Sequence, residues 1–212
     1  VVIFSPFYEN YGADTILSGA EPIYVPLVPP DFTFSIEQLE NAFKQGAKAL
    51  ILCNPSNPCG KVFTFEELTA IADVVKKYDA YVVTDEVYEH IVYAPNKHIY
   101  MQALDGMRER TIVCNSLSKT YSITGWRLGY VIANPEIIDR VKKVHDFLTV
   151  GAAAPLMEAA TVGLKFDDKY YDELAAHYAH MKEVFVGGLE KLGLKYTDPQ
   201  GAYYAVSYTH LT

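Results

Sequence analysis

The 212-residue chain has the composition of an ordinary folded globular protein. Half of its residues are hydrophobic and 21% are charged, which supplies a sizeable core and excludes charge-driven disorder. The formal net charge of -8 opposes binding to nucleic acid or to an anionic membrane surface, and no apolar run approaches the roughly 20 residues of a membrane-spanning helix. Three cysteines without metal-ligand or redox spacing favour a reducing cytoplasm.

Strand-like runs alternate with helical patterns along the chain. The expected strands are residues 1–4, 22–27, 48–53, 80–84, 111–114 and 127–133. Helices are expected at 36–45 and 65–78, from 134 onward, and from 169 to 192, where Gly187 and Gly188 should weaken the end. Capping-box pairs introduce the first two helices, Ser35 with Gln38 and Thr64 with Glu67. This alternation predicts an α/β fold, a mostly parallel sheet with helices on both faces.

Polar segments follow three of the predicted strands. They read NPSNPCG at 54–60, DEVY at 85–88 and SLSK at 116–119. Ligands of an open parallel sheet bind beyond the carboxyl ends of its strands, where loops supply amides and side chains. We therefore expect the three segments to converge on one crevice.

The same segments carry a family resemblance. NPSNPCG, DEVY and the longer stretch SLSKTYSITGWRLGY at 116–130 resemble, in order and spacing, the signatures of class I/II (fold type I) pyridoxal-phosphate-dependent aminotransferases. The last stretch is most similar to the branch with aspartate, aromatic and kynurenine-type enzymes. The resemblance covers nearly the whole chain. It implies the fold type I large domain, pyridoxal 5'-phosphate (PLP) as cofactor, and amino transfer between an L-amino acid and a 2-oxo acid.

By this resemblance, Lys119 is the residue that forms an imine with the cofactor aldehyde. Once freed by the substrate amine, it would move a proton from the substrate Cα to the cofactor C4′ carbon. A lone lysine is more often a solvated surface residue, but its place after Ser116 and Ser118 and before Arg127 favours the catalytic interpretation. We expect burial and nearby cationic charge to keep its amine partly neutral.

The resemblance gives Asp85, Tyr88 and Asn57 roles around the cofactor ring. Asp85 would pair with the pyridine nitrogen and keep it protonated, so that the ring accepts electrons. Tyr88 and Asn57 would hydrogen-bond the phenolic oxygen. The structural alternatives are a turn or helix N-cap for Asp85, turn chemistry for Asn57 and core packing for Tyr88. Lys119, Asp85 and Tyr88 form the predicted catalytic set.

Four further residues complete the predicted cofactor site. Ser116, Ser118 and Arg127 match a phosphate site, because hydroxyls and a guanidinium bind a dianion well. Tyr8 falls where related enzymes stack an aromatic ring on the pyridine, although the adjacent Phe7 or Tyr8 itself could belong to the core instead.

The chain also departs from the family pattern. Cys59 stands where threonine is usual, which removes an accessory hydroxyl but leaves the turn. His177 and His180 have a spacing that could bind a metal from one helix face, but Glu173 is their one obvious companion. We therefore assign both histidines to a helix surface and expect no metal.

The resemblance also divides the chain. Residues 1–180 would form the large PLP-binding domain without its N-terminal part, and residues 181–212 a connecting helix and the start of a small domain. We expect truncation at both ends, with a foreign tail from about residue 207. The family's carboxylate-binding arginine and glycine-containing phosphate loop have no counterpart here. The chain alone should therefore transaminate poorly, whereas the full-length enzyme should be a cytoplasmic homodimer.

Other functions stay open at this point. C–S lyases, racemases and decarboxylases of the same fold use the same lysine and aspartate, so the cofactor is better determined than the reaction. A non-enzymatic sensor domain of a transcription regulator is a second alternative, but it would need a basic DNA-binding module that this chain does not show. A nucleotide-binding module is remote, because no GxGxxG or GxxxxGK[ST] motif follows a strand.

Overall fold

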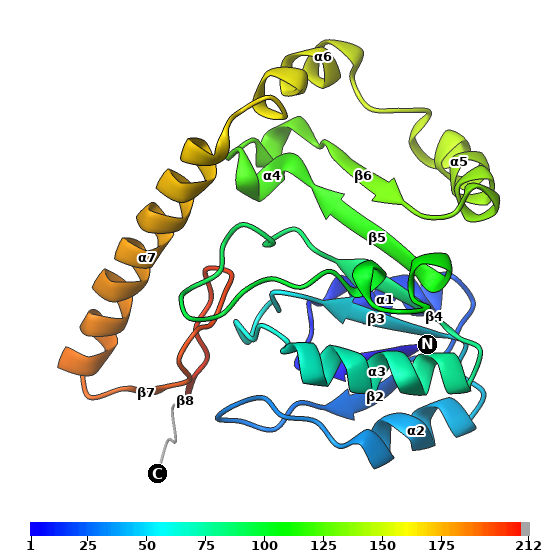
Figure 1. Cartoon of the computed structure of the whole chain (residues 1–212), viewed down its shortest axis with the longest axis horizontal. Helices are drawn as coiled ribbons and strands as arrows, with labels where there is room; N and C mark the ends of the chain where they lie inside the picture. The colour runs from blue at the N-terminus through cyan, green and yellow to red at the C-terminus, as the bar shows by residue number, and fades with distance from the viewer. Residues whose placement is uncertain (209–212) are drawn as a thin grey trace.

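The computed structural model describes residues 1–208, which fold around a six-stranded sheet (Figure 1). Its strands are β1 (Val2–Ser5), β2 (Ile23–Pro26), β3 (Ala49–Cys53), β4 (Tyr81–Asp85), β5 (Thr111–Ser116) and β6 (Gly129–Ile132). They lie in the order β2-β1-β3-β4-β5-β6, and β6 alone is antiparallel to its neighbour in this sheet. A small pair, β7 (Lys195–Tyr196) and β8 (Ser207–Tyr208), lies apart. The predicted mostly parallel sheet is confirmed.

Helices connect the strands and cover both faces of the sheet. They are α1 (Asn10–Leu17), α2 (Ile36–Lys44), α3 (Phe65–Lys77), α4 (Leu117–Thr120), α5 (Pro135–Thr149), α6 (Ala154–Gly163) and α7 (Asp168–Lys191). Short 3-10 turns are η1 (Met101–Ala103), η2 (Arg108–Arg110) and η3 (Thr124–Trp126). The chain steps from β1 to β2 in one direction and back past β1 to β3, so right-handed crossovers place α1 opposite α2 and α3 (Figure 1).

Local sequence explains which helices could be predicted. Thr64 starts α3 with a complete capping box, in which the Glu67 amide donates to Thr64 and the Thr64 amide to Glu67. At α2, Ser35 accepts from the Gln38 amide, but no return bond closes the box. Helices α1 and α6 were not predicted; neither begins with a side-chain cap, and both are much shorter than the predicted α7. Helix α7 continues through both of its glycines to Lys191, so the lower helix propensity of Gly187 and Gly188 does not end it.

The main core lies between the sheet and the pair α2 and α3. Val2, Leu50 and Val82 project from β1, β3 and β4 on the same face and are inaccessible to solvent. Leu39 and Ile71 meet them from the two helices and are equally buried. Burying side chains of this size contributes about 1.5–3 kcal/mol each. This packing holds the three strands in register and leaves their carboxyl ends free to carry polar groups.

The last third of the chain packs differently. Helices α5 and α7 contain no buried residue, and all four residues of β6 are exposed. Figure 1 shows α5, α6 and α7 outside the layers formed by α1, α2, α3 and the sheet. Within residues 1–208, no helix combines the length and the apolar character that crossing a membrane requires. The predicted division at residue 180 falls inside α7 and stays a prediction.

The segment after β7 returns to the turn that follows β3. The amides of Gln200 and Gly201 both donate to the Gly60 carbonyl at 2.9 Å, and the Gln200 side chain accepts from the Val62 amide. A Cβ on Gly201 would lie 2.8 Å from carbon atoms of Pro55 and Val62. Glycine is therefore required here by close packing, and this contact fixes the 199–205 segment against the turn between β3 and α3.

Gly201→Ala should destabilise the fold. The added methyl group forces the 199–205 segment away from Pro55 and Val62, and such overpacking costs typically about 1–3 kcal/mol. Gly187→Ala is the matched control, because nothing lies within 4 Å of its Cβ position in α7. There, alanine should raise the free energy of unfolding by about 0.5–1 kcal/mol. Urea unfolding measures both changes, and equal effects at the two glycines would contradict the packing argument.

Candidate active site

The carboxyl ends of three strands lie level at one edge of the sheet. Cys53 pairs with Asp85, and Asp85 pairs with Cys114, across β3, β4 and β5. A cavity of about 380 Å³ opens there, within the roughly 300–1,000 Å³ range of ligand pockets. Its lining includes every predicted site residue: Tyr8, Asn57, Asp85, Tyr88, Ser116, Ser118, Lys119 and Arg127. The structure thus brings the whole predicted set together, while the role of each member stays a prediction.

Both oxygens of the Asp85 carboxylate are held in place. The Tyr11 hydroxyl donates to one oxygen at 2.6 Å, and the Val87 amide donates to the other at 3.2 Å. Burial, together with the nearby Cys53 and Asp85 side chains, raises the pKa of Tyr11. The Tyr11 hydroxyl therefore keeps its proton in the folded protein and donates its hydrogen bond to Asp85. Sequence reasoning missed it, because its position in the first turn of the unpredicted α1 is what aims it at the cavity.

The structure separates the two candidate aromatic rings near residue 7. Phe7 stacks on Tyr24, with centroids 5.0 Å apart and planes at 9°. Tyr8 lines the cavity and meets Tyr11 edge to face at 5.6 Å. Tyr8 is thus the ring that a ligand in the cavity would contact.

Lys119 lies in α4 and is half-buried, with its Nζ 5.5 Å from the ring centroid of Tyr203. Hydrogen bonding to the Tyr203 hydroxyl raises the pKa of Lys119, and this effect outweighs the opposing effect of burial. We expected burial and cationic charge to lower this pKa. Burial acts in that direction, but the Tyr203 hydroxyl outweighs it, so the net shift is upward. The tyrosine arrives from the far end of the chain, so local sequence could not reveal it.

The hydroxyls and the guanidinium predicted for a phosphate surround the start of α4. Ser116 Oγ lies 2.7 Å from Ser118 Oγ and accepts from the Ser118 amide. Arg127 has a left-handed backbone, with φ of 56°, and donates from its guanidinium to the Thr124 carbonyl at 2.8 Å. A non-glycine residue in this region costs about 1–2 kcal/mol. Strain of this kind is often found at functional sites, which agrees with a binding role for Arg127.

A cluster of tyrosines forms one wall of the cavity. Tyr88 is buried, and its hydroxyl lies 3.0 Å from that of Tyr204. Burial raises the pKa of Tyr88, so its hydroxyl stays protonated. Tyr203 packs edge to face on Tyr88 at 5.1 Å. Sequence reasoning missed Tyr203 and Tyr204, because the return of the 199–205 segment to the β3 turn is what brings them here.

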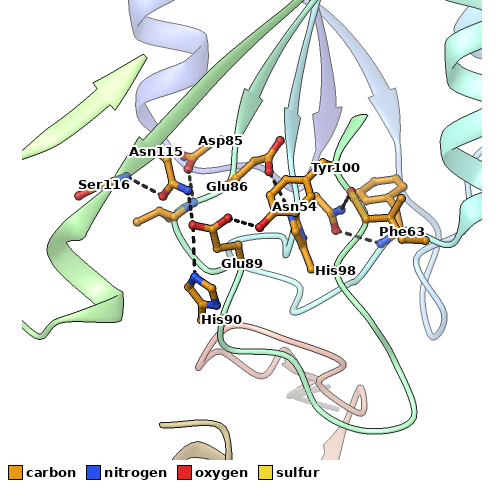
Figure 2. A network of polar contacts seen from close by, with 12 residues as sticks. Asn54, Phe63, Asp85, Glu86, Glu89, His90, His98, Tyr100, Asn115 and Ser116 are labelled. Carbon is orange, nitrogen blue, oxygen red and sulfur yellow. Dashed lines mark hydrogen bonds and ion pairs between the residues drawn. The ribbon is translucent and has the colours of Figure 1, made fainter. Parts of the chain in front are cut away.

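The histidines and carboxylates with metal-ligand chemistry lie on the surface or bind one another. His177 and His180 are exposed on α7, as expected. Glu86, Glu89 and His98 offer ligand atoms within 4.8 Å of one another, a cluster that sequence reasoning did not single out. His98 lies 2.9 Å from a Glu86 oxygen, and Glu89 accepts hydrogen bonds from other side chains (Figure 2). These three residues therefore belong to a hydrogen-bond network.

The sequence matches known proteins along nearly its whole length. The sequence profile of the family "Aminotransferase class I and II" matches residues 1–211. The chain belongs to this family. Human kynurenine--oxoglutarate transaminase 3 is 36% identical over 98% of this chain and 49% of its own length. The aspartate aminotransferase of Pyrococcus abyssi is 35% identical, over 96% of this chain and 53% of its own.

Solved aminotransferase structures share the fold. N-succinyldiaminopimelate aminotransferase from Mycobacterium tuberculosis matches with a TM-score of 0.91 and 32% identity, over 95% of this chain and 53% of that one. Aspartate aminotransferase from Thermus thermophilus with maleate matches with a TM-score of 0.89 and 27% identity. The match covers 97% of this chain and 54% of that one. The fold type I architecture is thus shown. The chain spans about half the length of the curated relatives it matches.

Tyr11→Phe should lower the free energy of unfolding, because it removes the hydrogen bond that holds the Asp85 carboxylate. Loss of a hydrogen bond to a charged group costs about 1.5–3 kcal/mol. Tyr81→Phe is the control, because Tyr81 is exposed at the start of β4. Urea unfolding at neutral pH measures the two variants. If Tyr11→Phe proved as stable as Tyr81→Phe, the bond to Asp85 would not be holding the carboxylate.

Tyr203→Phe should make Lys119 more reactive at a given pH. Without the hydroxyl that raises its pKa, Lys119 is left with the effect of burial, which lowers the pKa. The neutral fraction of the amine at about pH 8 to 9 therefore increases. Reductive methylation followed by peptide mass spectrometry gives the rate at Lys119 as a function of pH. We expect its inflection to move to lower pH. An unchanged inflection, matching that of the distant control Tyr196→Phe, would refute the coupling.

Proposed function

We propose that the full-length protein is a PLP-dependent aminotransferase, which moves an amino group between an L-amino acid and a 2-oxo acid. The observation that carries this proposal is the convergence of Lys119 and Asp85 on one cavity with Ser116, Ser118 and Arg127. An amine, a fixed carboxylate and a group of phosphate donors are the three elements that this cofactor needs. Membership of the aminotransferase family supports the same conclusion.

The residues present fit the cofactor. Asp85 lies at the end of β4, with both oxygens oriented by neighbours, as a partner for a protonated ring nitrogen requires. Tyr8 presents its ring to the cavity for stacking. Ser116, Ser118 and Arg127 offer hydroxyls and a guanidinium to a dianion. The cavity volume of about 380 Å³ falls in the range of small-ligand sites.

Each side chain then has a distinct task. Bound PLP supplies an aldehyde and an electron-accepting ring. The Lys119 amine holds the cofactor and transfers the proton at the substrate Cα. Asp85, fixed by Tyr11 and Val87, keeps the ring nitrogen protonated. Tyr88 and Asn57, which also line the cavity, would donate hydrogen bonds to the cofactor ring and so adjust the basicity of the bound group. The Lys119 amine would need to be neutral to hold the cofactor, and the Tyr203 hydroxyl, which raises the pKa of Lys119, opposes that neutral form.

The related reactions receive less support. A C–S lyase of the same fold would use the same lysine and aspartate, but the similar proteins named above are all aminotransferases. Those relatives act on kynurenine, aspartate or N-succinyldiaminopimelate according to their names, so they favour transfer without selecting a substrate. A non-enzymatic sensor domain is not favoured either, because the similar proteins named above carry the names of enzymes.

The assembly and the division of the protein form part of the proposal. We assign residues 1–180 to the large cofactor-binding domain, and residues 181–212 to a connecting helix and the start of the small domain. We also propose a homodimer in the cytoplasm. Exposed apolar side chains support an interface: Phe147 and Leu148 in α5 are 92% and 75% exposed. Residues 209–212, within the proposed foreign tail, lie outside the described residues.

Lys119→Ala tests the cofactor assignment. PLP incubated with the unaltered chain, then reduced with borohydride, should be found on the Lys119 peptide by mass spectrometry. The Lys119→Ala chain should lose this label, while Lys48→Ala, at the exposed edge before β3, should keep it. Addition of a 2-oxo acid to the pyridoxamine form of the full-length protein then separates transfer from elimination. Labelling spread evenly over surface lysines would contradict the assignment.

A further inference from the structure

A hydrogen-bonded chain lies directly behind the cavity. Asn115 and Ser116 line the cavity, whereas Glu89 is absent from its lining. The Asn115 side-chain amide donates to Glu89 Oε1 at 2.6 Å, and the Tyr100 hydroxyl donates to Glu89 Oε2 at 2.7 Å. On its other side, Asn115 Oδ1 accepts from the Ser116 amide at 2.7 Å. Figure 2 shows Glu89, Asn115 and Ser116 in this sequence, with Tyr100 on the far side of Glu89.

The carboxylate of Glu89 determines which way the Asn115 amide points. An ionised carboxylate only accepts hydrogen bonds, whereas an amide has one end that donates and one that accepts. Asn115 must therefore turn its NH₂ group toward Glu89, which leaves its oxygen facing the Ser116 amide. Were Asn115 reversed, two oxygens would meet at Glu89 and two N–H groups would meet at Ser116. The charge of Glu89 thus fixes the hydrogen bond between Asn115 and Ser116, although Glu89 takes no part in that bond.

The burial of Glu89 makes this arrangement costly unless every partner is present. Its side chain is 10% exposed, and Asn115 is 9% exposed. Buried carboxylates are retained where hydrogen bonds compensate for the lost hydration. Asn115 and Tyr100 supply that compensation, one at each oxygen. Because each carboxylate oxygen of Glu89 accepts one of these hydrogen bonds, the carboxylate is held away from the cavity.

The chain ends at the residues proposed to hold the phosphate. Ser116 closes β5 and caps α4, and its hydroxyl accepts from the Ser118 amide at 3.1 Å. The two serine hydroxyls lie 2.7 Å apart. Rotation of the Ser116 backbone would therefore displace both hydroxyls. Through Asn115, Glu89 opposes that rotation.

We propose that Glu89 is a positioning residue for phosphate recognition, acting through the Asn115 amide on the Ser116 turn. This inference rests on the proposed function, because it concerns how the PLP phosphate is held. Glu89 does not line the cavity, so it acts on the ligand only through its neighbours. Its contribution is selectivity for a phosphorylated cofactor over the same ring without the phosphate.

Glu89→Gln provides the test, read out as the ratio of dissociation constants for pyridoxal and PLP. In the full-length protein, glutamine presents one donor and one acceptor, so it no longer fixes the orientation of Asn115. We expect the ratio to fall about tenfold, the loss that follows when a charge-assisted hydrogen bond is misaligned. Affinity for pyridoxal should change little. A general loss of structure would weaken the binding of both ligands alike and leave the ratio unchanged. An unchanged ratio would overturn the proposal.

Two further variants separate orientation from packing. Tyr100→Phe removes the other hydrogen bond of Glu89 but keeps the carboxylate facing Asn115, so the ratio should stay near that of the unaltered protein. The double variant Glu89→Gln/Asn115→Asp exchanges amide and carboxylate at constant net charge. The new glutamine then donates to the new aspartate, whose carboxylate still accepts from the Ser116 amide. We expect this pair to regain most of the selectivity.

The outcomes distinguish the inference from the proposed function. Selectivity lost in Glu89→Gln and regained in the double variant supports the positioning role. An equal loss in Tyr100→Phe, or no recovery in the double variant, overturns it while PLP binding itself stands. If the unaltered protein binds neither PLP nor pyridoxal, the proposed function fails and the inference fails with it.

Discussion

The site depends on the parallel pairing of β3, β4 and β5. Their register places Cys53, Asp85 and Cys114 side by side, so the residues that follow each strand emerge at one edge of the sheet. Leu50 and Val82, buried against α2 and α3, hold this register from below. A slip of one residue would turn each apolar side chain to the opposite face, which the core does not allow. The hydrophobic core therefore fixes the positions of the polar groups.

Around this edge, the polar groups of the cavity are oriented by hydrogen bonds to neighbouring side chains. Tyr11 holds Asp85, and the chain from Glu89 through Asn115 holds Ser116. The lost hydration of such groups is offset only if each donor meets an acceptor, which makes the orientation of each one specific. The side chains that would bind a ligand in this cavity are thus already oriented before it arrives. Tyr203 shows the opposite effect, because its hydroxyl stabilises the charged form of Lys119.

Much of the fold and site could be predicted because the relevant signals are local. Alternating apolar runs marked the strands, and the Thr64 capping box marked α3. Helices α1 and α6 escaped prediction. Neither has a side-chain cap, and large apolar residues such as Ile16, Leu17 and Val162 are exposed and do not form a buried stripe. Tyr11 was missed with α1. Tyr203 and Tyr204 were missed because only the packing of Gly201 against the β3 turn brings Tyr204 to the cavity and Tyr203 against Tyr88.

The sequence by itself determined the order of the six strands and of helices α2, α3, α5 and α7, the resemblance to the aminotransferases and the eight predicted side chains that line the cavity. These features are encoded in residue types at short spacings, which local sterics and strand periodicity translate directly. Tertiary structure alone decided the orientation of those side chains, the direction of the Lys119 pKa shift and the network behind Ser116. Each of these depends on groups distant in sequence, such as Tyr11 with Asp85 or Glu89 with Asn115, whose distance and burial exist only once the chain has folded.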